Sequence, residues 1–212
     1  MNQARKAALV ALARYPLKSG AGEALEAAAV HLRGLAEDRR WMVVDEAGHF
    51  VTARQHGALL GVRAEAGVKG ALTLRAKGRT PCSVPGPSPS APTRTVQVWK
   101  DACSALDLGP EAAQWISETV GQSCRVVYMP DRVERPVSGA QAQPGDQVSF
   151  ADGFPLLLTL QESLEHLNEG IKPPVPMRCF RPNVVVAGFE PYAEQTWSRV
   201  RIGSVDFEVA GP

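Results

Sequence analysis

Lys18, Ser19 and Arg39, near the start of the chain, carry side chains whose chemistry could serve binding. An ammonium point charge, a hydroxyl donor and a planar guanidinium fork together suit a phosphate or another anionic group. Each residue also has an ordinary explanation. Lys18 and Ser19 could form a solvated turn, and Arg39 could pair with Glu37 or Asp38 at the surface, where such a pair contributes about 0 to 1 kcal/mol.

A second pair of polar side chains, Arg181 and Asn183, lies near the other end of the chain on either side of a proline that stiffens the loop. An arginine and an amide can fix a polar heterocycle by hydrogen bonds. The same arrangement also serves as a structural clamp on neighbouring carbonyl groups, so both interpretations stay open.

Signals for other chemistry are absent from the sequence. There is no Gly-x-Ser-x-Gly elbow, no phosphate-binding P-loop and no Gly-x-Gly-x-x-Gly turn. Asp152 is a lone carboxylate without an evident partner, and we interpret it as structural. The four histidines show no clustered spacing, and no Cys-x-x-Cys pair occurs, so we expect reduced thiols. The cysteines are Cys82, Cys103, Cys124 and Cys179.

The charge balance and the apolar segments limit the partners. Lys and Arg total 23 against 22 Asp and Glu, which leaves no excess of positive charge for a nucleic-acid backbone. No segment approaches the roughly 20 uninterrupted apolar residues of a membrane-spanning helix. The apolar run near the N-terminus is interrupted by Arg14 and is followed by no cleavage pattern of small residues. We therefore expect a cytoplasmic protein that binds neither nucleic acid nor membranes.

Short strands are expected to position these side chains. Apolar runs bounded by turn residues predict them over 7–13, 41–44, 50–53, 71–74, 125–128, 147–150, 184–186, 200–202 and 205–209. Trp41, Trp99 and Trp115 are assigned to packing, and Trp197 to a buried position that supports the fold. The predicted class is β-rich α+β with a few short helices.

Two helices and one proline-rich segment interrupt the strands. Pro110 and Gly121 suit the first position and the end of a helix over 110–120. Thr159 and Glu162 form a capping box that predicts the start of a second helix, which Gly170 would end. Residues 80–92 contain five prolines and read as a linker or excursion.

In order along the chain, a series of motifs resembles the MOSC proteins that carry an N-terminal β-barrel domain, the family of the mitochondrial amidoxime-reducing component and its bacterial relatives. The match runs almost end to end, and the order of the motifs makes it specific. The motifs are Arg14-Tyr15-Pro16-Leu17-Lys18-Ser19, Gly34 with Asp38-Arg39-Arg40-Trp41, Thr52-Ala53-Arg54-Gln55, Asp107-Leu108-Gly109 through Trp115, Ser149-Phe150-Ala151-Asp152-Gly153-Phe154-Pro155, Ser163-Leu164 with Leu167-Asn168, and Phe180-Arg181-Pro182-Asn183 with Glu194 and Trp197.

The resemblance implies a fold and a cofactor. An N-terminal β-barrel-like domain over residues 5–94, including the proline-rich excursion, would pack on an incomplete MOSC β-barrel domain over residues 95–212. The cofactor would be molybdenum cofactor (molybdopterin), with binding of pyridoxal phosphate left open as a second property. The contacts carried over from relatives are those of Lys18, Ser19, Arg39, Gly153, Phe154, Arg181 and Asn183, the two at Gly153 and Phe154 through the backbone.

One departure from the family pattern concerns the metal. Relatives continue after the strand at 205–209 with a Cys-x-x-Cys segment whose second cysteine is a molybdenum ligand, and a soft thiolate suits that metal. We expect that cysteine beyond Pro212, so no metal ligand and no catalytic residue is predicted within this chain. Cys179 is considered as a substitute and set aside, because the family pattern gives its position no ligand role.

Three hypotheses follow for the activity. The first is a molybdenum-dependent oxidoreductase that reduces N-hydroxylated or related N-oxygenated small molecules, with electrons from a flavin or iron-sulfur partner. The second is a non-catalytic cofactor-binding or sulfur-carrier module, since MOSC domains also occur in cofactor sulfurases. The third is an inert fragment with exposed strand edges.

Overall fold

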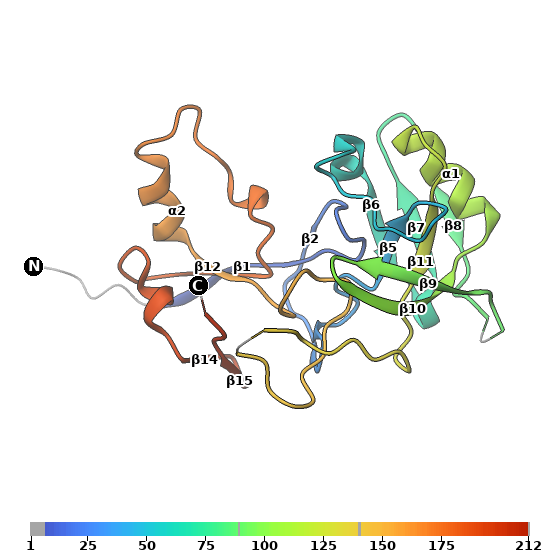
Figure 1. Cartoon of the computed structure of the whole chain (residues 1–212). Helices are drawn as coiled ribbons and strands as arrows, with labels where there is room; N and C mark the ends of the chain where they lie inside the picture. The colour runs from blue at the N-terminus through green and yellow to red at the C-terminus, as the bar shows by residue number, and fades with distance from the viewer. Residues whose placement is uncertain (1–6, 89, 140, 212) are drawn as a thin grey trace, which may run out of the picture.

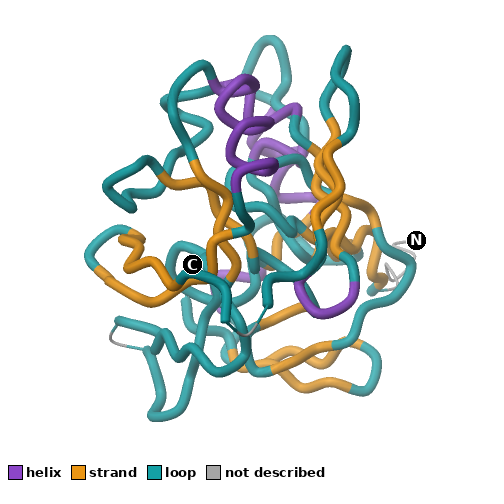
Figure 2. Tube along the Cα trace, turned by 90° about the vertical axis from the view of Figure 1, so that its right-hand side faces the viewer, coloured by secondary structure: helices purple, strands orange, loops and turns teal. Residues whose placement is uncertain are grey.

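The computed structural model describes residues 7–88, 90–139 and 141–211, and this part of the chain is β-rich, as predicted. Its strands form five sheets, and the two α-helices are short. Strands and loops make up most of the trace (Figure 2). Figure 1 shows helix α1 with strands β5 to β11 at one end of the molecule, and helix α2 with β1, β12, β14 and β15 at the other.

The larger end is built on an antiparallel sheet in the order β5-β11-β10-β9. Its strands are β5 (Trp41–Val44), β11 (Arg125–Tyr128), β10 (Asp101–Asp107) and β9 (Thr93–Val98). All four residues of β5 are buried, because core clusters pack against both faces of that strand. The strand therefore reads as a continuous apolar run and shows no alternation.

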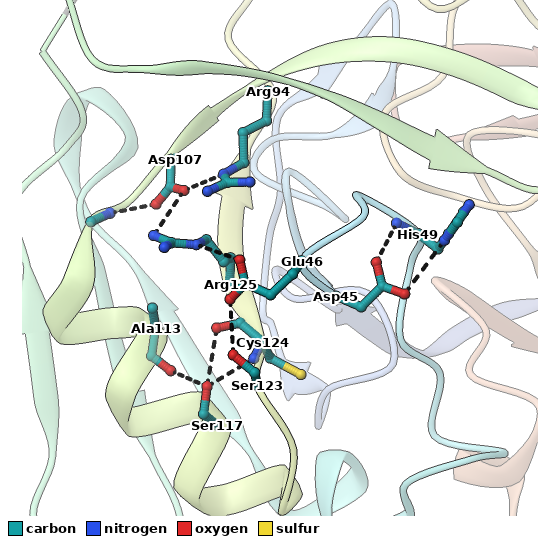
Figure 3. Close-up of polar contacts among 11 residues, drawn as sticks. Asp45, Glu46, His49, Arg94, Asp107, Ala113, Ser117, Ser123, Cys124 and Arg125 are labelled. Atoms are coloured by element: carbon teal, nitrogen blue, oxygen red, sulfur yellow. Dashed lines mark hydrogen bonds and ion pairs between the residues drawn. The ribbon is translucent and has the colours of Figure 1, made fainter.

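Helix α1 (Pro110–Val120) covers one face of this sheet, with the bounds that its sequence predicts. Pro110 occupies the first turn, and Gly121 adopts the left-handed conformation with φ of 82°. The carboxylate of Asp107 accepts a hydrogen bond of 2.8 Å from the backbone N–H of Gly109 and contacts Arg94 and Arg125 (Figure 3). This carboxylate therefore joins the start of the helix to the end of β10.

A second, smaller sheet packs on the same core. It contains β6 (Arg63–Ala66), β7 (Leu72–Arg75) and β8 (Cys82–Val84), with β7 in the middle. Leu72 and Leu74 point into the core beside Trp115 and Ile116 of α1. Each fully buried leucine stabilises the fold by roughly 1.5–3 kcal/mol relative to an exposed one. This core holds the larger end together.

Strand β8 corrects one prediction. It lies within residues 80–92, which the prolines had marked as a linker or excursion. Pro81 and Pro85 flank the strand, which lies at the edge of its sheet, where a missing backbone donor is tolerated. Gly86 follows, and a Cβ there would lie 2.0 Å from the carbonyl oxygen of Lys69, so the chain passes too close for a side chain.

The first strand pairs with a strand from the last third of the chain. Strand β1 (Ala8–Arg14) is antiparallel to β13 (Val184–Ala187), which is parallel to β12 (Leu158–Leu160). Strand β2 (Glu23–Ala24) completes this sheet, and helix α2 (Gln161–Asn168) follows β12 directly. The loop that follows β1 and the loop that precedes β13 are therefore close in space, although they are far apart in sequence.

Small elements complete the fold. Strands β14 (Arg199–Ile202) and β15 (Val205–Glu208) form the predicted hairpin, and β3 (Val30–His31) pairs with β4 (Gly34–Leu35). The 3₁₀ helices are η1 (Gly57–Gly61), η2 (Val68–Gly70), η3 (Met177–Cys179) and η4 (Ala193–Thr196). Within the described ranges, no helix is both long enough and apolar enough to cross a membrane.

Three predicted elements are wrong. Residues 50–53 form no strand, and Phe50 makes only an isolated bridge with Val44. The N–H of Phe50 donates to Gln97 and that of Val51 to Val43, so the segment does not continue along one partner strand.

Residues 147–150 also form no strand; Gln147 makes only an isolated bridge with Pro136. The carbonyls of Ser149 and Phe150 instead accept hydrogen bonds from Arg135 and Lys18, so they are not available to a neighbouring strand.

The capping box at Thr159 and Glu162 is the third error. Thr159 belongs to β12, α2 begins at Gln161 without a side-chain cap, and it ends at Asn168, before Gly170. The Glu162 carboxylate instead accepts a hydrogen bond of 2.7 Å from the backbone N–H of Gly188. A tertiary contact has replaced the local one.

The predicted domain boundary between residues 94 and 95 lies inside β9 and stays a prediction. Residues 5, 6, 89, 140 and 212, which belong to the predicted domains, lie outside the described residues, and residue 89 is also part of the predicted proline-rich segment.

Candidate anion-binding cavity

Lys18 follows β1 and is almost fully buried. Its position is fixed by the backbone, since its N–H donates to the carbonyl of Trp41 at 2.8 Å. The ammonium group donates to the carbonyl of Phe150 at 2.7 Å and to the carboxylate of Asp152. Burial lowers the pKa of Lys18, and the charge of Asp152 opposes this shift.

Arg39 lies in the loop before β5, beside a buried carboxylate. Its guanidinium donates to Asp38, to the side-chain oxygen of Asn183 at 2.8 Å and to the carbonyl of Arg181 at 3.2 Å. Asp38 is 2% exposed and also accepts the backbone N–H of Tyr15 at 2.8 Å. Burial raises the pKa of Asp38, and the charge of Arg39 opposes the rise.

The ring of Tyr15 lies next to both cavity arginines. The guanidinium carbons of Arg39 and Arg181 are 4.6 and 4.3 Å from its centroid. Burial and the neighbouring charge of Arg39 lower the pKa of Arg181 to about 10. A Cβ on Gly22 would lie 2.5 Å from the tyrosine ring, so glycine leaves the room that this ring needs. Two like charges are therefore held close together by one aromatic ring.

Asn183 holds the walls of the cavity together. It is 1% exposed, and its side-chain oxygen accepts hydrogen bonds from Arg39 and from the backbone N–H of Leu157 at 3.2 Å. Its amide nitrogen donates to the carbonyl of Ala13 at 3.2 Å. The clamp that the sequence offered as one alternative is thus present in the geometry.

All seven residues predicted to contact the cofactor line one cavity of about 1610 Å³. Ser19 is half-buried, and Phe154 is exposed. A Cβ built on Gly153 meets nothing within 4 Å, so sterics do not require glycine there. The full set is Lys18, Ser19, Arg39, Gly153, Phe154, Arg181 and Asn183. Whether they bind a cofactor stays a prediction.

The backbone around this cavity is unusual. Ser19, Arg39, Trp99 and Arg181 all line it, and they have φ of 66°, 49°, 55° and 58°. Side chains other than glycine rarely adopt this left-handed conformation, which costs on the order of 1–3 kcal/mol per residue. Such residues cluster at functional sites, because the surrounding fold imposes a conformation that sets the direction of the side chain.

The side chains of the cavity suit an anion better than a metal ion. Five Lys or Arg side chains and five carboxylates line the cavity as a whole. Three of these cations, Lys18, Arg39 and Arg181, are grouped at one place, where Asp152 pairs with Lys18 and Asp38 pairs with Arg39. Within residues 7–88, 90–139 and 141–211, no three His, Cys, Asp or Glu side chains come together to hold a metal. The arrangement can therefore hold phosphate-like groups by charge-assisted hydrogen bonds.

The cysteines divide between the core and the cavity. Cys82, Cys103 and Cys124 are buried, and burial raises the pKa of each thiol, which disfavours the thiolate that binds metals. Cys179 is exposed and lines the cavity. Val209, Ala210 and Gly211 also line it, after the last strand.

Three participating residues escaped sequence reasoning. Trp99 was assigned to packing, but 44% of it is exposed at the cavity. Asp152 was read as a lone carboxylate, yet it pairs with Lys18 from 134 positions away. Tyr15 belongs to the first family motif, but no role was predicted for it. Trp41 and Trp115 are buried as predicted, whereas Trp197 is only half-buried, against Phe189.

Comparison with known proteins identifies the family. The model of the MOSC N-terminal beta barrel domain matches residues 6–123, more than half of the chain, and the model of the MOSC domain matches residues 145–212. The chain therefore belongs to the MOSC family. A solution structure of a Bordetella bronchiseptica protein covers 50% of the chain and 90% of its own, with 23% identity and a TM-score of 0.38.

The similar curated proteins share one description. Mitochondrial amidoxime-reducing component 1 of Mus musculus is 35% identical over 92% of this chain, and that of Homo sapiens is 32% identical over 92%. The chain spans 59% and 60% of the length of these relatives. Because the relatives are named as mitochondrial, the prediction of a cytoplasmic protein is wrong.

Proposed function

We propose that the chain forms the molybdopterin-binding part of a molybdenum-cofactor protein, and that the whole protein reduces N-hydroxylated or related N-oxygenated substrates. The observation that supports this proposal is the convergence of Lys18, Arg39 and Arg181 on one cavity. The names of the relatives, amidoxime-reducing components, support the reaction class.

Each cavity residue has a role in this proposal. Lys18, Arg39 and Arg181 pair with the anionic phosphate of the pterin, and Ser19 supplies a hydroxyl donor. Asn183, already bound to Arg39, keeps that guanidinium in place. Gly153 and Phe154 offer backbone groups to the cofactor. When bound, the cofactor supplies the redox chemistry, with electrons from a flavin or iron-sulfur partner.

The metal ligand belongs to a different part of the proposal. The donors that the structure describes fit the anionic part of the cofactor and provide no metal cluster. In the family pattern a ligand cysteine follows the strand that corresponds to β15. Val209 to Gly211, directly after β15, line the cavity, so the chain at this point runs along its wall. This placement is compatible with a ligand supplied from there.

Retention of the pterin tests the cofactor proposal. The 212-residue chain is expressed in a host that makes the cofactor, purified under reducing conditions, and its pterin is oxidised and measured by fluorescence. We expect Lys18→Ala and Arg181→Gln to lower pterin affinity roughly 10-fold or more. The controls Lys77→Ala and Arg75→Gln carry the same changes outside the cavity and should keep wild-type affinity. Equal retention by all variants, or preferential retention of pyridoxal phosphate, would contradict the proposal.

Turnover separates the oxidoreductase from the alternatives. The gene product from which the sequence comes is loaded with cofactor, supplied with a reductase and assayed for loss of an N-hydroxylated substrate. Reduction supports the oxidoreductase. Persulfide or cofactor transfer without reduction would instead support the sulfur-carrier module, and a metal-loaded protein active in neither assay would leave only an inert fragment.

A further inference from the structure

Trp99 occupies a position where a bulky residue is not expected. Val98 pairs with Asp101 at the end of the β9-β10 hairpin, so Trp99 and Lys100 alone form the connection. Two-residue hairpin connections favour glycine, asparagine or aspartate, because they need positive φ. Trp99 nevertheless adopts φ of 55°. In this position the residue lines the cavity.

The indole is held in one orientation and still remains accessible. Its N–H donates to the carboxylate of Asp152 at 2.9 Å, and its ring lies edge-on to Phe50 at 4.9 Å between centroids. Even so, 44% of the residue is exposed. A fixed aromatic surface of this kind suits stacking, because binding costs little side-chain entropy.

A second hollow adjoins the main cavity at this tryptophan. It has a volume of about 400 Å³ and shares Phe50, Thr52, Arg54 and Trp99 with the main cavity. Trp99 therefore lies where the two hollows meet. Lys18 is linked to Trp99 at this place, because Asp152 accepts hydrogen bonds from both side chains.

Arg54 places a positive charge beside the indole. Its guanidinium carbon lies 5.8 Å from the Trp99 ring centroid, and its side chain is exposed. In the described part of the chain, no carboxylate forms an ion pair with it. This charge is available to a ligand.

We propose that Trp99 and Arg54 form a binding subsite for a planar aromatic group that carries a negative charge. The ring stacks on the exposed indole, and the anionic substituent pairs with the Arg54 guanidinium. In a substrate, this aromatic group would be the part that lies away from the reacting nitrogen, and that assignment rests on the proposed function. The binding of the group to Trp99 and Arg54 does not depend on the proposed function.

The experiment follows the indole N–H signals of the ¹⁵N-labelled chain by NMR. The chain has four tryptophans, and Trp99→Phe identifies the signal of Trp99. Benzoate is titrated beside two matched probes, cyclohexanecarboxylate with the same charge but no flat ring, and benzyl alcohol with the ring but no charge. Inorganic phosphate is kept in constant excess throughout, to compete with the probes for Lys18, Arg39 and Arg181.

We expect benzoate to shift the Trp99 signal, with a midpoint roughly 2- to 10-fold lower than that of cyclohexanecarboxylate. Benzyl alcohol should also bind more weakly than benzoate. Arg54→Gln should raise the benzoate midpoint about 2- to 5-fold, and the control Arg75→Gln should leave it unchanged. Trp99→Asn tolerates the left-handed turn but has no indole signal at this position, so its benzoate binding is followed by saturation-transfer difference NMR on the benzoate protons. We expect the transfer seen with the wild-type chain to be lost in this variant.

Three results would overturn the subsite: no benzoate shift at Trp99, equal midpoints for benzoate and cyclohexanecarboxylate, or an unchanged midpoint in Arg54→Gln. The other indole signals report whether each variant is folded. Benzoate binding at Trp99 in a chain that retains no pterin would support the subsite while contradicting the proposed function, so the two failures are distinguishable.

Discussion

The guanidinium of Arg39 donates a hydrogen bond of 2.8 Å to the side-chain oxygen of Asn183, which lies 144 positions further along the chain. Asn183 in turn donates to the carbonyl of Ala13 and accepts from the backbone of Leu157. One buried amide therefore connects the loop before β5, the strand β1 and the segment before β12. Residues that sequence motifs place far apart meet in one small network.

Removal of the Arg39 side chain should destabilise the fold. Arg39→Ala leaves the Asp38 carboxylate, 2% exposed, without its cation, and breaking a buried pair in this way costs about 3–5 kcal/mol. Urea unfolding followed by circular dichroism gives the free energy of unfolding. Arg75→Ala breaks the exposed pair with Glu65 and should cost no more than about 1 kcal/mol. An equal loss of unfolding free energy in the two variants would show that Arg39 does not stabilise the buried Asp38 carboxylate.

Tyr15 should act as a positioning residue for the two arginines. Tyr15→Phe keeps the ring next to both guanidinium groups but removes the hydrogen bond of 3.0 Å to the carbonyl of Pro182. Tyr15→Leu removes the ring as well, and each cation–π contact contributes about 0.5–2 kcal/mol. We expect pterin affinity to fall roughly 10-fold in Tyr15→Leu and less than about 3-fold in Tyr15→Phe.

Titration calorimetry at two salt concentrations checks this role. A purely structural tyrosine would lower thermal stability in both variants and leave the affinity of the folded fraction unchanged. That outcome would contradict the positioning role.

Asp152 should make stability depend on acid pH. Burial alone would raise its pKa, but the charge of Lys18 and the hydrogen bonds from Lys18 and Trp99 hold the pKa below the ordinary 3.8. The folded state thus binds this proton less readily than the unfolded state, so the stabilisation is present above pH 3.8 and is lost as the pH falls through the lower folded value. Asp152→Asn should flatten the stability profile in that window.

The flattening should not exceed about 1 kcal/mol, because the Asp152 side chain is 66% exposed and its ion pair is screened. Urea midpoints measured from pH 5 down to pH 2 for both proteins provide the test. Parallel profiles would mean that the Lys18–Asp152 pair contributes nothing to folding.

Asp107 should affect stability without affecting the cavity. Its carboxylate accepts a hydrogen bond from the N–H of Gly109, just before α1, and contacts Arg94 and Arg125, and it is not among the residues that line the cavity (Figure 3). Asp107→Ala should lower the free energy of unfolding by about 2–3 kcal/mol, since this hydrogen bond and two charged partners are lost. Pterin affinity measured well below the melting temperature should stay at the wild-type value. A loss of affinity would indicate coupling between α1 and the cavity.

Sequence reasoning succeeded where the determinants are local. Pro110 and Gly121 set the bounds of α1 through their own backbone preferences, and both bounds are confirmed. The glycine and serine at 203 and 204 set the hairpin of β14 and β15 in the same way. Lys18 and Arg181 were named through family motifs, because nothing local distinguishes them from solvated residues. Their place in a shared cavity depends on the pairing of β1 with β13.

Sequence reasoning failed where a distant side chain competes with a local pattern. Residues 147–150 have the composition of a strand, but Arg135 takes the carbonyls of Ser149 and Ala151, and Lys18 takes that of Phe150. Thr159 and Glu162 have capping spacing, but the Glu162 carboxylate binds the backbone of Gly188. A single sequence does not contain the positions of these partners in space.

The pairing of β1 with β13 also bears on how the chain is made. A ribosome that has synthesised the first 130 residues has released a strand, residues 8–14, whose antiparallel neighbour at 184–187 does not yet exist. During that interval its backbone donors and acceptors are open to another nascent chain. A piece cut at the end of the first family match, residue 123, would keep this vulnerability permanently, so the two matched regions are poor choices for separate expression.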